Sequence, residues 1–310
     1  VAEGLVLGRD RKVHALAVLC TWLAVRNGVV MEIAQTTVEA NGLSFGALTC
    51  GDSGPLALCL HGFPDSAHTW RHLLPQLADA GYRAVAPWTR GYAPTVVPSD
   101  GDYSAAALSA DANALHDALG GDGDAVLIGH DWGALATYNA AANEPTKWRR
   151  LVTLAVPPPG IATNAFFRYE QLKRSFYIML FQTPLAEIVV GADDLIFIER
   201  LWADWSPSYD GSADLPHVKA ALRAPANLAA AIGYYRAMFS VGGGDKSPPQ
   251  PTLYLHGTDD GAFGVEGVAG TEQNLSAESR VDIIDGVGHF LHLERPDEIN
   301  KLILDWLATE

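Results

Sequence analysis

Asp131 lies in a segment that could present a carboxylate nucleophile. It follows the apolar run 125–128 and stands between Gly129 and Gly133. A strand that runs straight into a helix forces its central turn residue into strained φ and ψ angles, and flanking glycines let neighbouring backbone pass closely. A carboxylate is already ionised at neutral pH and can attack an sp³ carbon without the help of a base. The alternative is a solvent-facing Asp that stabilises a helix N-terminus.

A second segment could stabilise negative charge. The apolar run 56–60 is followed by the tight loop 61–64, a His-Gly-Phe-Pro sequence. A loop in this place can supply a backbone N–H to an oxyanion hole, together with the N–H of the residue after the nucleophile. The candidate donors are therefore the backbone N–H groups of Phe63 and Trp132. A purely structural turn is the alternative.

Two late segments could supply an acid and a base. Asp259 and Asp260 follow the apolar run 252–255, and His289 follows the run 281–284. A carboxylate can orient an imidazole that then activates water, and the chain order nucleophile, acid, base fits this arrangement. His289 on its own could equally well be a structural residue.

Metal and cofactor sites have little support in the sequence. His289, His292 and Glu294 have a helical spacing that could bind a metal, but no further ligands cluster near them, so we expect no metal and no cofactor. The three cysteines are odd in number and lack a Cys-x-x-Cys spacing, which argues against a disulfide framework and a structural zinc site. A reducing cytoplasm therefore fits the chain.

These residues need a scaffold that brings strand ends together. From residue 36 onward, short apolar runs alternate with helical segments, which is the βαβ pattern. Several strands are continuous apolar runs, as expected for strands covered on both faces. The predicted strands are 36–40, 43–50, 56–60, 83–87, 125–128, 151–155, 252–255 and 281–284, and the predicted helices are 70–80, 105–119, 132–143 and 298–308.

The pattern changes between the proline-rich stretches 156–160 and 248–251. Strand signals almost disappear there, and aromatic, helix-like stretches replace them. This predicts a helical insertion in a parallel sheet, bounded by proline hinges. We expect a core at 33–158 and 248–310 with a helical cap at 159–247.

Composition excludes several classes of protein. With 310 residues, 48% hydrophobic and 18% charged, the chain is neither disordered nor a coiled coil nor collagen-like. Its net charge of −15 and its lack of a basic stripe argue against nucleic acid as a partner.

We interpret residues 1–32 as an N-terminal extension, with an accessory helix as one form it could take. Its apolar run 13–25 is too short to cross a bilayer, so we expect no membrane partner.

On these motifs the chain resembles an α/β-hydrolase of the epoxide hydrolase type, from about residue 33 to its end. The segments 61–64, 129–133 and 288–290 match that family, and the Arg-Gly-Tyr loop that begins at Arg90 resembles the corresponding loop. Trp88 departs from the pattern, because the family often has an Asp there. The resemblance implies the α/β-hydrolase fold, a mostly parallel eight-stranded sheet flanked by helices, with a helical cap after the sixth strand.

Two segments of the predicted cap extend the resemblance. Tyr177 stands four residues before the Phe-Gln-x-Pro segment 181–184, and Tyr235 is followed by Arg236, as in the family. Arg236 fixes the register and selects Tyr235 over Tyr234. The resemblance implies that Tyr177 and Tyr235 bind substrate and donate hydrogen bonds to the epoxide oxygen, and that Phe63 and Trp132 also contact the substrate.

The function implied by the resemblance is conversion of a small-molecule epoxide and water to a vicinal diol. Asp131 would attack an epoxide carbon and form a covalent glycol ester, which His289 would hydrolyse by activating water. Asp260 is preferred over Asp259 as the acid that orients His289, because it follows Gly257 in a Gly-x-x-Asp pattern. The preferred epoxide and the oligomeric state are left open.

Haloalkane dehalogenase is the main alternative, because that family shares the Asp–Trp turn. Its members bind the released halide with the indole N–H after the nucleophile and a second donor, often an Asn at the position of Phe63. Phe63 has no side-chain donor, although Trp202 or Trp205 could replace it. A non-catalytic ligand receptor on the same fold is a third hypothesis.

Large apolar side chains of the predicted cap could line a pocket or pack in the core. We expect core packing for most of them. They are Phe166, Phe167, Phe176, Met179 and Phe181.

Overall fold

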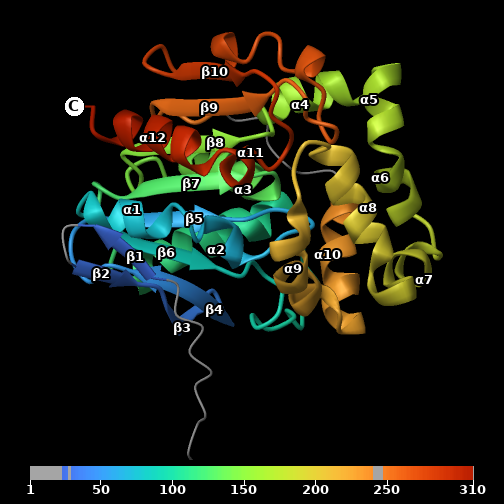
Figure 1. Ribbon diagram of the computed structural model, residues 1–310, viewed down its shortest axis with the longest axis horizontal. Helices are drawn as coiled ribbons and strands as arrows, with labels where there is room; N and C mark the ends of the chain where they lie inside the picture. The colour runs from blue at the N-terminus through green and yellow to red at the C-terminus, as the bar shows by residue number, and fades with distance from the viewer. Residues whose placement is uncertain (1–22, 27–28, 240–246, 310) are drawn as a thin grey trace, which may run out of the picture.

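The computed structural model describes residues 23–26, 29–239 and 247–309. Its centre is an eight-stranded sheet in the order β10-β9-β8-β7-β5-β6-β4-β3 (Figure 1). Neighbouring strands from β10 to β6 are parallel, whereas β4 runs antiparallel to β6 and to β3, which confirms the predicted mostly parallel sheet. The strands are β3 (Ala34–Ala40), β4 (Leu43–Cys50), β5 (Leu56–Leu60), β6 (Arg83–Pro87), β7 (Val126–His130), β8 (Arg150–Leu154), β9 (Thr252–Gly257) and β10 (Arg280–Ile284).

The central strands bring two of the candidate segments to one edge of the sheet. Every residue of β5, β7 and β8 is buried, as expected for parallel strands covered on both faces. Leu60, the last residue of β5, is paired in register with Gly129 of β7. Because both strands run in the same direction, the loop 61–64 and Asp131 leave the sheet side by side.

Helices cover both faces of the sheet (Figure 1). Helix α2 packs on α3 on one face, and α1 contacts α12 on the other. The start of α2 is fixed by Ser104, whose hydroxyl accepts a hydrogen bond from the backbone N–H of Ala107. These four helices are α1 (Leu74–Asp79), α2 (Ala105–Ala118), α3 (Trp132–Asn143) and α12 (Pro296–Leu307).

The segment between β8 and β9 is helical in its described part, as predicted. It follows the sixth strand of the main sheet and lies over the ends of the strands that carry the candidate residues (Figure 1). We call this segment the cap. Its α-helices are α4 (Pro159–Phe166), α5 (Tyr169–Arg174), α6 (Phe176–Phe181), α7 (Ala186–Gly191), α8 (Ile196–Trp205), α9 (Leu215–Leu222) and α10 (Pro225–Ala237).

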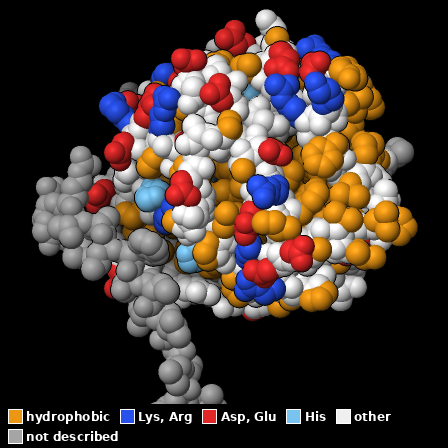
Figure 2. All heavy atoms as spheres, turned by 45° about the vertical axis from the view of Figure 1, so that its right-hand side comes forward, with side chains coloured by type: hydrophobic (Ala, Val, Ile, Leu, Met, Phe, Trp, Pro, Cys, Tyr) orange, Lys and Arg blue, Asp and Glu red, His pale blue; other side chains and the backbone are white. Residues whose placement is uncertain are grey.

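The outer side of the cap carries several exposed apolar side chains, and Figure 2 shows such side chains gathered on this side of the molecule. The core packing expected for Phe167, Phe176 and Met179 is wrong, because they are 69%, 49% and 44% exposed. Phe167 directly follows α4, and Phe176 and Met179 lie on the exposed side of α6. Phe166 and Phe181 are buried.

The first described residues form a small antiparallel pair of strands. Strands β1 (Leu23–Arg26) and β2 (Val29–Glu32) pair with each other. An accessory helix therefore does not extend over these strands, and the rest of the predicted extension, 1–22 and 27–28, lies outside the described part of the chain. None of the helices in the described ranges combines the length and apolar character that a membrane span requires.

Candidate active site

Asp131 occupies a strained turn between β7 and α3. Its φ and ψ angles are 53° and −117°, a conformation that non-glycine residues rarely adopt. The turn also needs the glycines around it. A Cβ atom at Gly129 would lie 2.2 Å from the carbonyl oxygen of Gly133, and one at Gly133 would lie 2.1 Å from that of Leu60. The strained turn predicted from the two glycines is therefore present.

A backbone N–H group holds the Asp131 carboxylate. The N–H of Phe63 donates to Oδ1 at 2.8 Å. The neighbouring N–H of Trp132 also lowers the pKa of this carboxyl group. Gly62 makes this approach possible, since a Cβ there would lie 2.4 Å from Oδ1. Burial raises the pKa of Asp131, and the positive charge of His289 and the two N–H groups oppose that rise.

His289 and Asp260 form a second, fully buried pair behind Asp131. Nδ1 of His289 lies 2.9 Å from Oδ2 of Asp260, and Oδ1 of Asp260 accepts hydrogen bonds from the backbone N–H groups of Ala262 and Phe263. Asp259 is exposed and accepts a hydrogen bond from a threonine hydroxyl in the same turn. The structure therefore places Asp260, and not Asp259, beside the imidazole.

The other ring nitrogen of His289 faces the candidate nucleophile. Its Nε2 lies 3.7 Å from Oδ2 of Asp131, which is too far for a direct hydrogen bond. Burial lowers the pKa of His289, but the charge and hydrogen bond of Asp260 and the charge of Asp131 outweigh this, so the pKa is raised above its usual 6.5. The ring centroid of Trp205, a cap residue, lies 5.0 Å from that of the imidazole. The backbone carbonyl oxygen of Trp205 accepts a hydrogen bond from the backbone N–H of His289. Sequence reasoning had not assigned Trp205 this position.

Two tyrosines of the cap face the same space. Tyr177 of α6 and Tyr235 of α10 lie with ring centroids 5.4 Å apart, and the ring of Tyr235 packs edge-on against Trp132 and Phe63. Burial raises the pKa of both phenols far above the usual value, so both keep their protons. The Tyr235 hydroxyl has no hydrogen-bond partner among the described residues, whereas the hydroxyl of Tyr234 donates to the carbonyl oxygen of Arg90.

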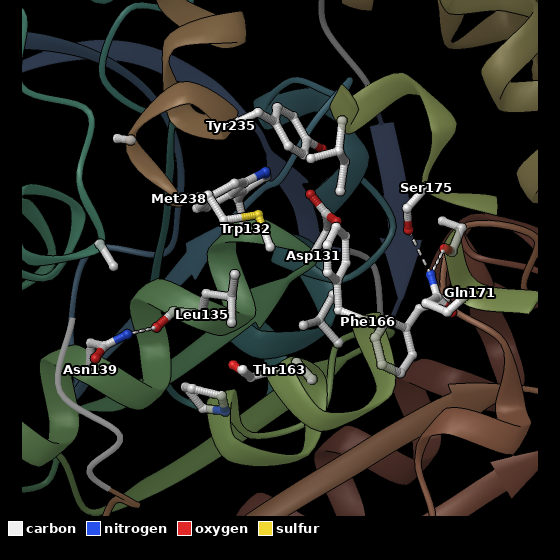
Figure 3. Close-up of a pocket in the computed structure, with 18 of the residues that line it drawn as sticks. Asp131, Trp132, Leu135, Asn139, Thr163, Phe166, Gln171, Ser175, Tyr235 and Met238 are labelled. Carbon is white, nitrogen blue, oxygen red and sulfur yellow. Dashed lines mark hydrogen bonds between the residues drawn. The ribbon is translucent and has the colours of Figure 1, made fainter. Parts of the chain in front are cut away.

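A cavity of about 530 Å³ joins these groups. Asp131, Trp132, Tyr177, Tyr235 and His289 line it, and Figure 3 shows the Asp131 carboxylate directed into it. The cavity therefore brings together residues from the edge of the sheet and from the cap helices α6 and α10.

Phe63 and Asp260 are not part of the cavity wall, although we had predicted substrate contact for Phe63. The Phe63 ring is fully buried and packs against Phe181 and Tyr235. Sequence reasoning missed several lining residues: Leu135, Asn139, Thr163, Gln171, Ser175 and Met238. For Leu135 and Asn139, the helical spacing from Trp132 was a usable signal.

Trp202, one of the two tryptophans considered as halide donors, is engaged elsewhere. The indole N–H of Trp202 donates to the carbonyl oxygen of Pro64 at 2.7 Å, and its ring stacks on Phe290. Neither Trp202 nor Trp205 lines the cavity. Trp88, the departure from the family pattern, is buried and packs near the ring of His68.

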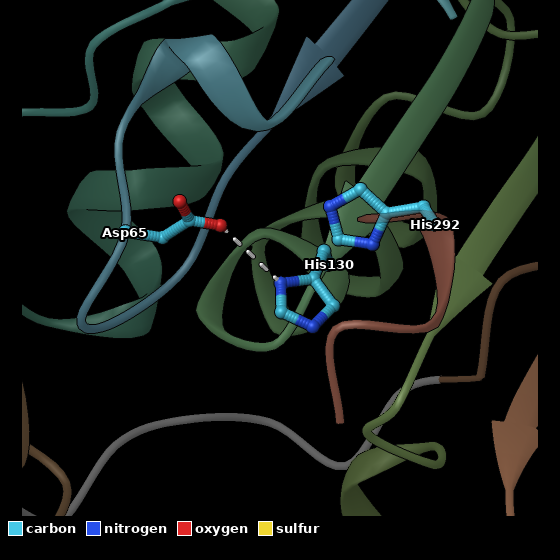
Figure 4. A group of neighbouring side chains, drawn as sticks. All are labelled: Asp65, His130 and His292. Carbon is cyan, nitrogen blue, oxygen red and sulfur yellow. Dashed lines mark ion pairs between the residues drawn. The ribbon is translucent and has the colours of Figure 1, made fainter. Parts of the chain in front are cut away.

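A separate buried group, Asp65, His130 and His292, is shown in Figure 4. It adjoins the catalytic residues, since the ring centroid of His130 lies 4.7 Å from that of His289. Nδ1 of His130 lies 3.9 Å from Oδ2 of Asp65, and its Nε2 donates to the backbone carbonyl of His289 at 3.0 Å. Burial lowers the pKa of both histidines and raises that of Asp65. One ligand atom from each residue lies within 4.8 Å of the others, so these residues could hold a metal. They also connect the segment before Asp131 to the segment around His289.

The metal set considered from the sequence is not brought together. His289 is bound to Asp260, His292 stacks on Trp70, and Glu294 accepts the backbone N–H of Gly288.

Comparisons with known proteins agree with this geometry. A family model described as the alpha/beta hydrolase fold matches residues 55–187. Epoxide hydrolase A of Mycobacterium tuberculosis is 30% identical, over 88% of this chain and 97% of the relative, and human epoxide hydrolase 4 is 31% identical, over 88% and 78%. The crystal structure of epoxide hydrolase A from Mycobacterium thermoresistibile superimposes with a TM-score of 0.75 at 28% identity, covering 89% of this chain and 98% of that one.

Proposed function

Since the chain belongs to the epoxide hydrolases of the α/β-hydrolase superfamily, we propose that it converts an epoxide and water to a vicinal diol through a covalent ester on Asp131. One observation carries this proposal. The Asp131 carboxylate lies between the backbone N–H of Phe63 and the imidazole of His289, in a cavity shared with Tyr177 and Tyr235. That set supplies a nucleophile, an oxyanion hole, a base and two acids.

In the first step Asp131 attacks a carbon of the epoxide ring. Its Oδ1 is held by the N–H of Phe63, which leaves Oδ2 as the attacking atom. The ring oxygen leaves as an alkoxide, a poor leaving group that needs a proton or hydrogen bonds as the C–O bond breaks. Tyr177 and Tyr235 fit this role, since burial keeps their pKa values high and both phenols protonated. The hydroxyl of Tyr235, which has no partner among the described residues, is free to donate.

In the second step water hydrolyses the ester. His289 in its neutral form takes a proton from water through Nε2, while Asp260 holds Nδ1–H and stabilises the imidazolium that forms. The water oxygen attacks the ester carbon, and the negative charge develops on Oδ1. The N–H of Phe63 bonds Oδ1, and the N–H of Trp132, the residue after the nucleophile, is the second donor that we assign to this oxyanion.

The protons balance over the two steps. A tyrosine supplies the hydrogen of the first diol hydroxyl. The imidazolium of His289 protonates the ester oxygen as the C–O bond to the Asp131 carbonyl breaks, which gives the second hydroxyl. The remaining hydrogen of the water restores the tyrosine, and Asp131 returns as a carboxylate.

A turnover screen tests this proposal. Purified protein is assayed with styrene oxide, a trans-disubstituted epoxide and 1-bromobutane, with diol and bromide measured separately, and Asp131→Ala serves as the control. We expect diol from an epoxide, no bromide, and no turnover by the control. Bromide without diol would favour a dehalogenase, ligand binding without turnover would favour a receptor, and full activity in Asp131→Ala would exclude the ester mechanism.

A further inference from the structure

The cavity continues beyond the catalytic residues along two helices. Trp132, Leu135 and Asn139 line it from α3 at spacings of three and four residues, which places them on one face of that helix. Ala162 and Thr163 line it from α4. We call the part of the cavity bounded by Leu135, Asn139, Ala162 and Thr163 the α3 arm. In Figure 3 the labelled residues of this arm lie on one side of Asp131, and Gln171 and Ser175 lie on the other.

The Gln171 side chain forms a fixed part of the cavity wall. Gln171 is only 5% exposed, and its amide nitrogen donates to the Ser175 hydroxyl and to the carbonyl oxygen of Ala262 at 2.9 and 2.8 Å. Its amide oxygen accepts the backbone N–H of Gly264 at 3.1 Å. Both ends of the amide are therefore bonded to protein. This wall restricts the size of a substituent on that side of the nucleophile.

The α3 arm instead leads from the buried nucleophile towards the surface. Asp131 is 7% exposed, Leu135 and Asn139 are half-buried, and Thr163 is exposed. Leu135 and Ala162 line this arm with apolar side chains, Thr163 adds a polar one, and Asn139 is the labelled residue of the arm farthest from Asp131 in Figure 3. A substrate chain in this arm would therefore be removed from water near the ring and reach water at its end.

We propose that the α3 arm binds the long chain of an unsymmetrical epoxide. The ring lies at Asp131, a hydrogen or a small substituent faces Gln171, and a linear apolar chain runs along α3 to Asn139. The seven helical steps from Trp132 to Asn139 rise ~10.5 Å, which an extended chain of about ten carbons spans in about nine bonds of ~1.2 Å each. This assignment rests on the proposed epoxide hydrolysis and adds the class of substrate: epoxides with one linear apolar chain of up to about ten carbons.

Chain length gives a direct test. Each methylene removed from water should raise kcat/KM about two- to fourfold, and methylenes beyond Asn139 should add nothing. The assay measures kcat/KM for 1,2-epoxybutane, 1,2-epoxyhexane, 1,2-epoxyoctane, 1,2-epoxydecane and 1,2-epoxytetradecane, each below its solubility limit. We expect a rise that levels off at about ten carbons.

Two neighbouring substitutions on α4 provide the matched comparison. Thr163 lines the arm, and the neighbouring Asn164 is also exposed but does not line it. Thr163→Phe should lower kcat/KM for 1,2-epoxydecane at least about tenfold and leave 1,2-epoxybutane within about twofold. Asn164→Phe should match the wild type on both substrates. Ala162→Leu should reproduce the selective loss, which provides a second variant if Thr163→Phe does not fold.

The inference fails if diol forms but kcat/KM is flat or falls with chain length. It also fails if the Thr163 and Ala162 variants show the same chain-length dependence as Asn164→Phe. Failure of the proposed function has a different signature, because no epoxide, including 1,2-epoxybutane, would then yield diol.

Discussion

Removal of the Tyr235 hydroxyl separates epoxide opening from the rest of the cycle. Tyr235→Phe keeps the ring and its contacts with Trp132 and Phe63, and it removes a hydroxyl that has no partner among the described residues. Folding should therefore change little. The lost group is a hydrogen bond to a developing alkoxide, and a hydrogen bond to a charged group contributes about 1.5–3 kcal/mol, which corresponds to a roughly 10- to 150-fold loss in the alkylation rate.

The loss should be confined to the first chemical step. Tyr177→Phe should slow alkylation to a similar extent, and the double variant should lose roughly 10³- to 10⁴-fold, since the two donors share one oxygen. Ester hydrolysis uses His289 and the oxyanion hole, so its rate constant should stay close to that of the wild type. Rapid-quench single-turnover experiments with styrene oxide measure the formation and decay of the ester separately.

Tyr234→Phe is the matched control. This neighbouring buried tyrosine donates its hydroxyl to the carbonyl oxygen of Arg90 and does not line the cavity. Its removal should lower the free energy of unfolding by about 1 kcal/mol and leave alkylation unchanged. Wild-type alkylation in the Tyr177 and Tyr235 double variant, or equal slowing in Tyr234→Phe, would refute the acid role.

Three further predictions concern the hydrolytic step and the metal content. In the free enzyme an NMR titration of His289 should give a midpoint above 6.5, because Asp260 and the charged Asp131 raise its pKa; a midpoint below 6.5 would contradict this. The rate constant of ester hydrolysis should rise with pH and level off, because only neutral His289 can accept a proton, and its midpoint should lie below that of the free enzyme, because the esterified Asp131 has lost its charge. In Asp260→Asn the backbone N–H groups of Ala262 and Phe263 would retain the amide oxygen and turn the NH₂ towards His289. That favours the wrong imidazole tautomer, so the rate of ester hydrolysis should fall roughly 10³-fold or more, while alkylation of Asp131 persists. Equal losses in both steps would argue against an orienting role for Asp260. Dialysis against EDTA should leave turnover unchanged; loss of activity together with release of bound metal would instead indicate an occupied site in the buried group of Figure 4.

The sheet and the turn that bears Asp131 could be predicted because their signals are local. Strands β5, β7 and β8 are buried on both faces and so appear in the sequence as continuous apolar runs. The strained φ of Asp131 requires small neighbouring residues, and Gly129 and Gly133 in the sequence indicate this requirement. One local error is the start of the predicted helix 70–80. Residues Ala67–Trp70 form a 3-10 turn, and α1 begins only at Leu74.

The cap side of the site could not be derived from local pattern. Tyr177 and Tyr235 were identified only through a family resemblance, since nothing in the periodicity of their helices distinguishes them from core tyrosines. Trp205, which packs on His289, and Gln171, which closes the cavity wall through Ala262, depend on how the cap docks onto the sheet. Such contacts join residues far apart in the chain and leave no trace in hydrophobic spacing.

The buried group of Asp65, His130 and His292 also depends on contacts between distant parts of the chain. Asp65 lies in the loop after β5, His130 is the last residue of β7, and His292 lies in the short helix α11 (Leu291–Glu294). Each taken alone has an ordinary structural explanation. Only the parallel arrangement of the sheet brings them within reach of one another.

The covalent ester is the central claim, and one measurement tests it most directly. In His289→Gln the nucleophile and the cap tyrosines remain, so Asp131 should still be alkylated, while water is no longer activated and the ester should accumulate. Intact-protein mass spectrometry after mixing with styrene oxide should show one added substrate mass, localised by peptide mapping to the peptide that contains Asp131. The double variant Asp131→Ala, His289→Gln should show none. An unmodified His289→Gln protein, or an adduct on another residue, would contradict the ester mechanism.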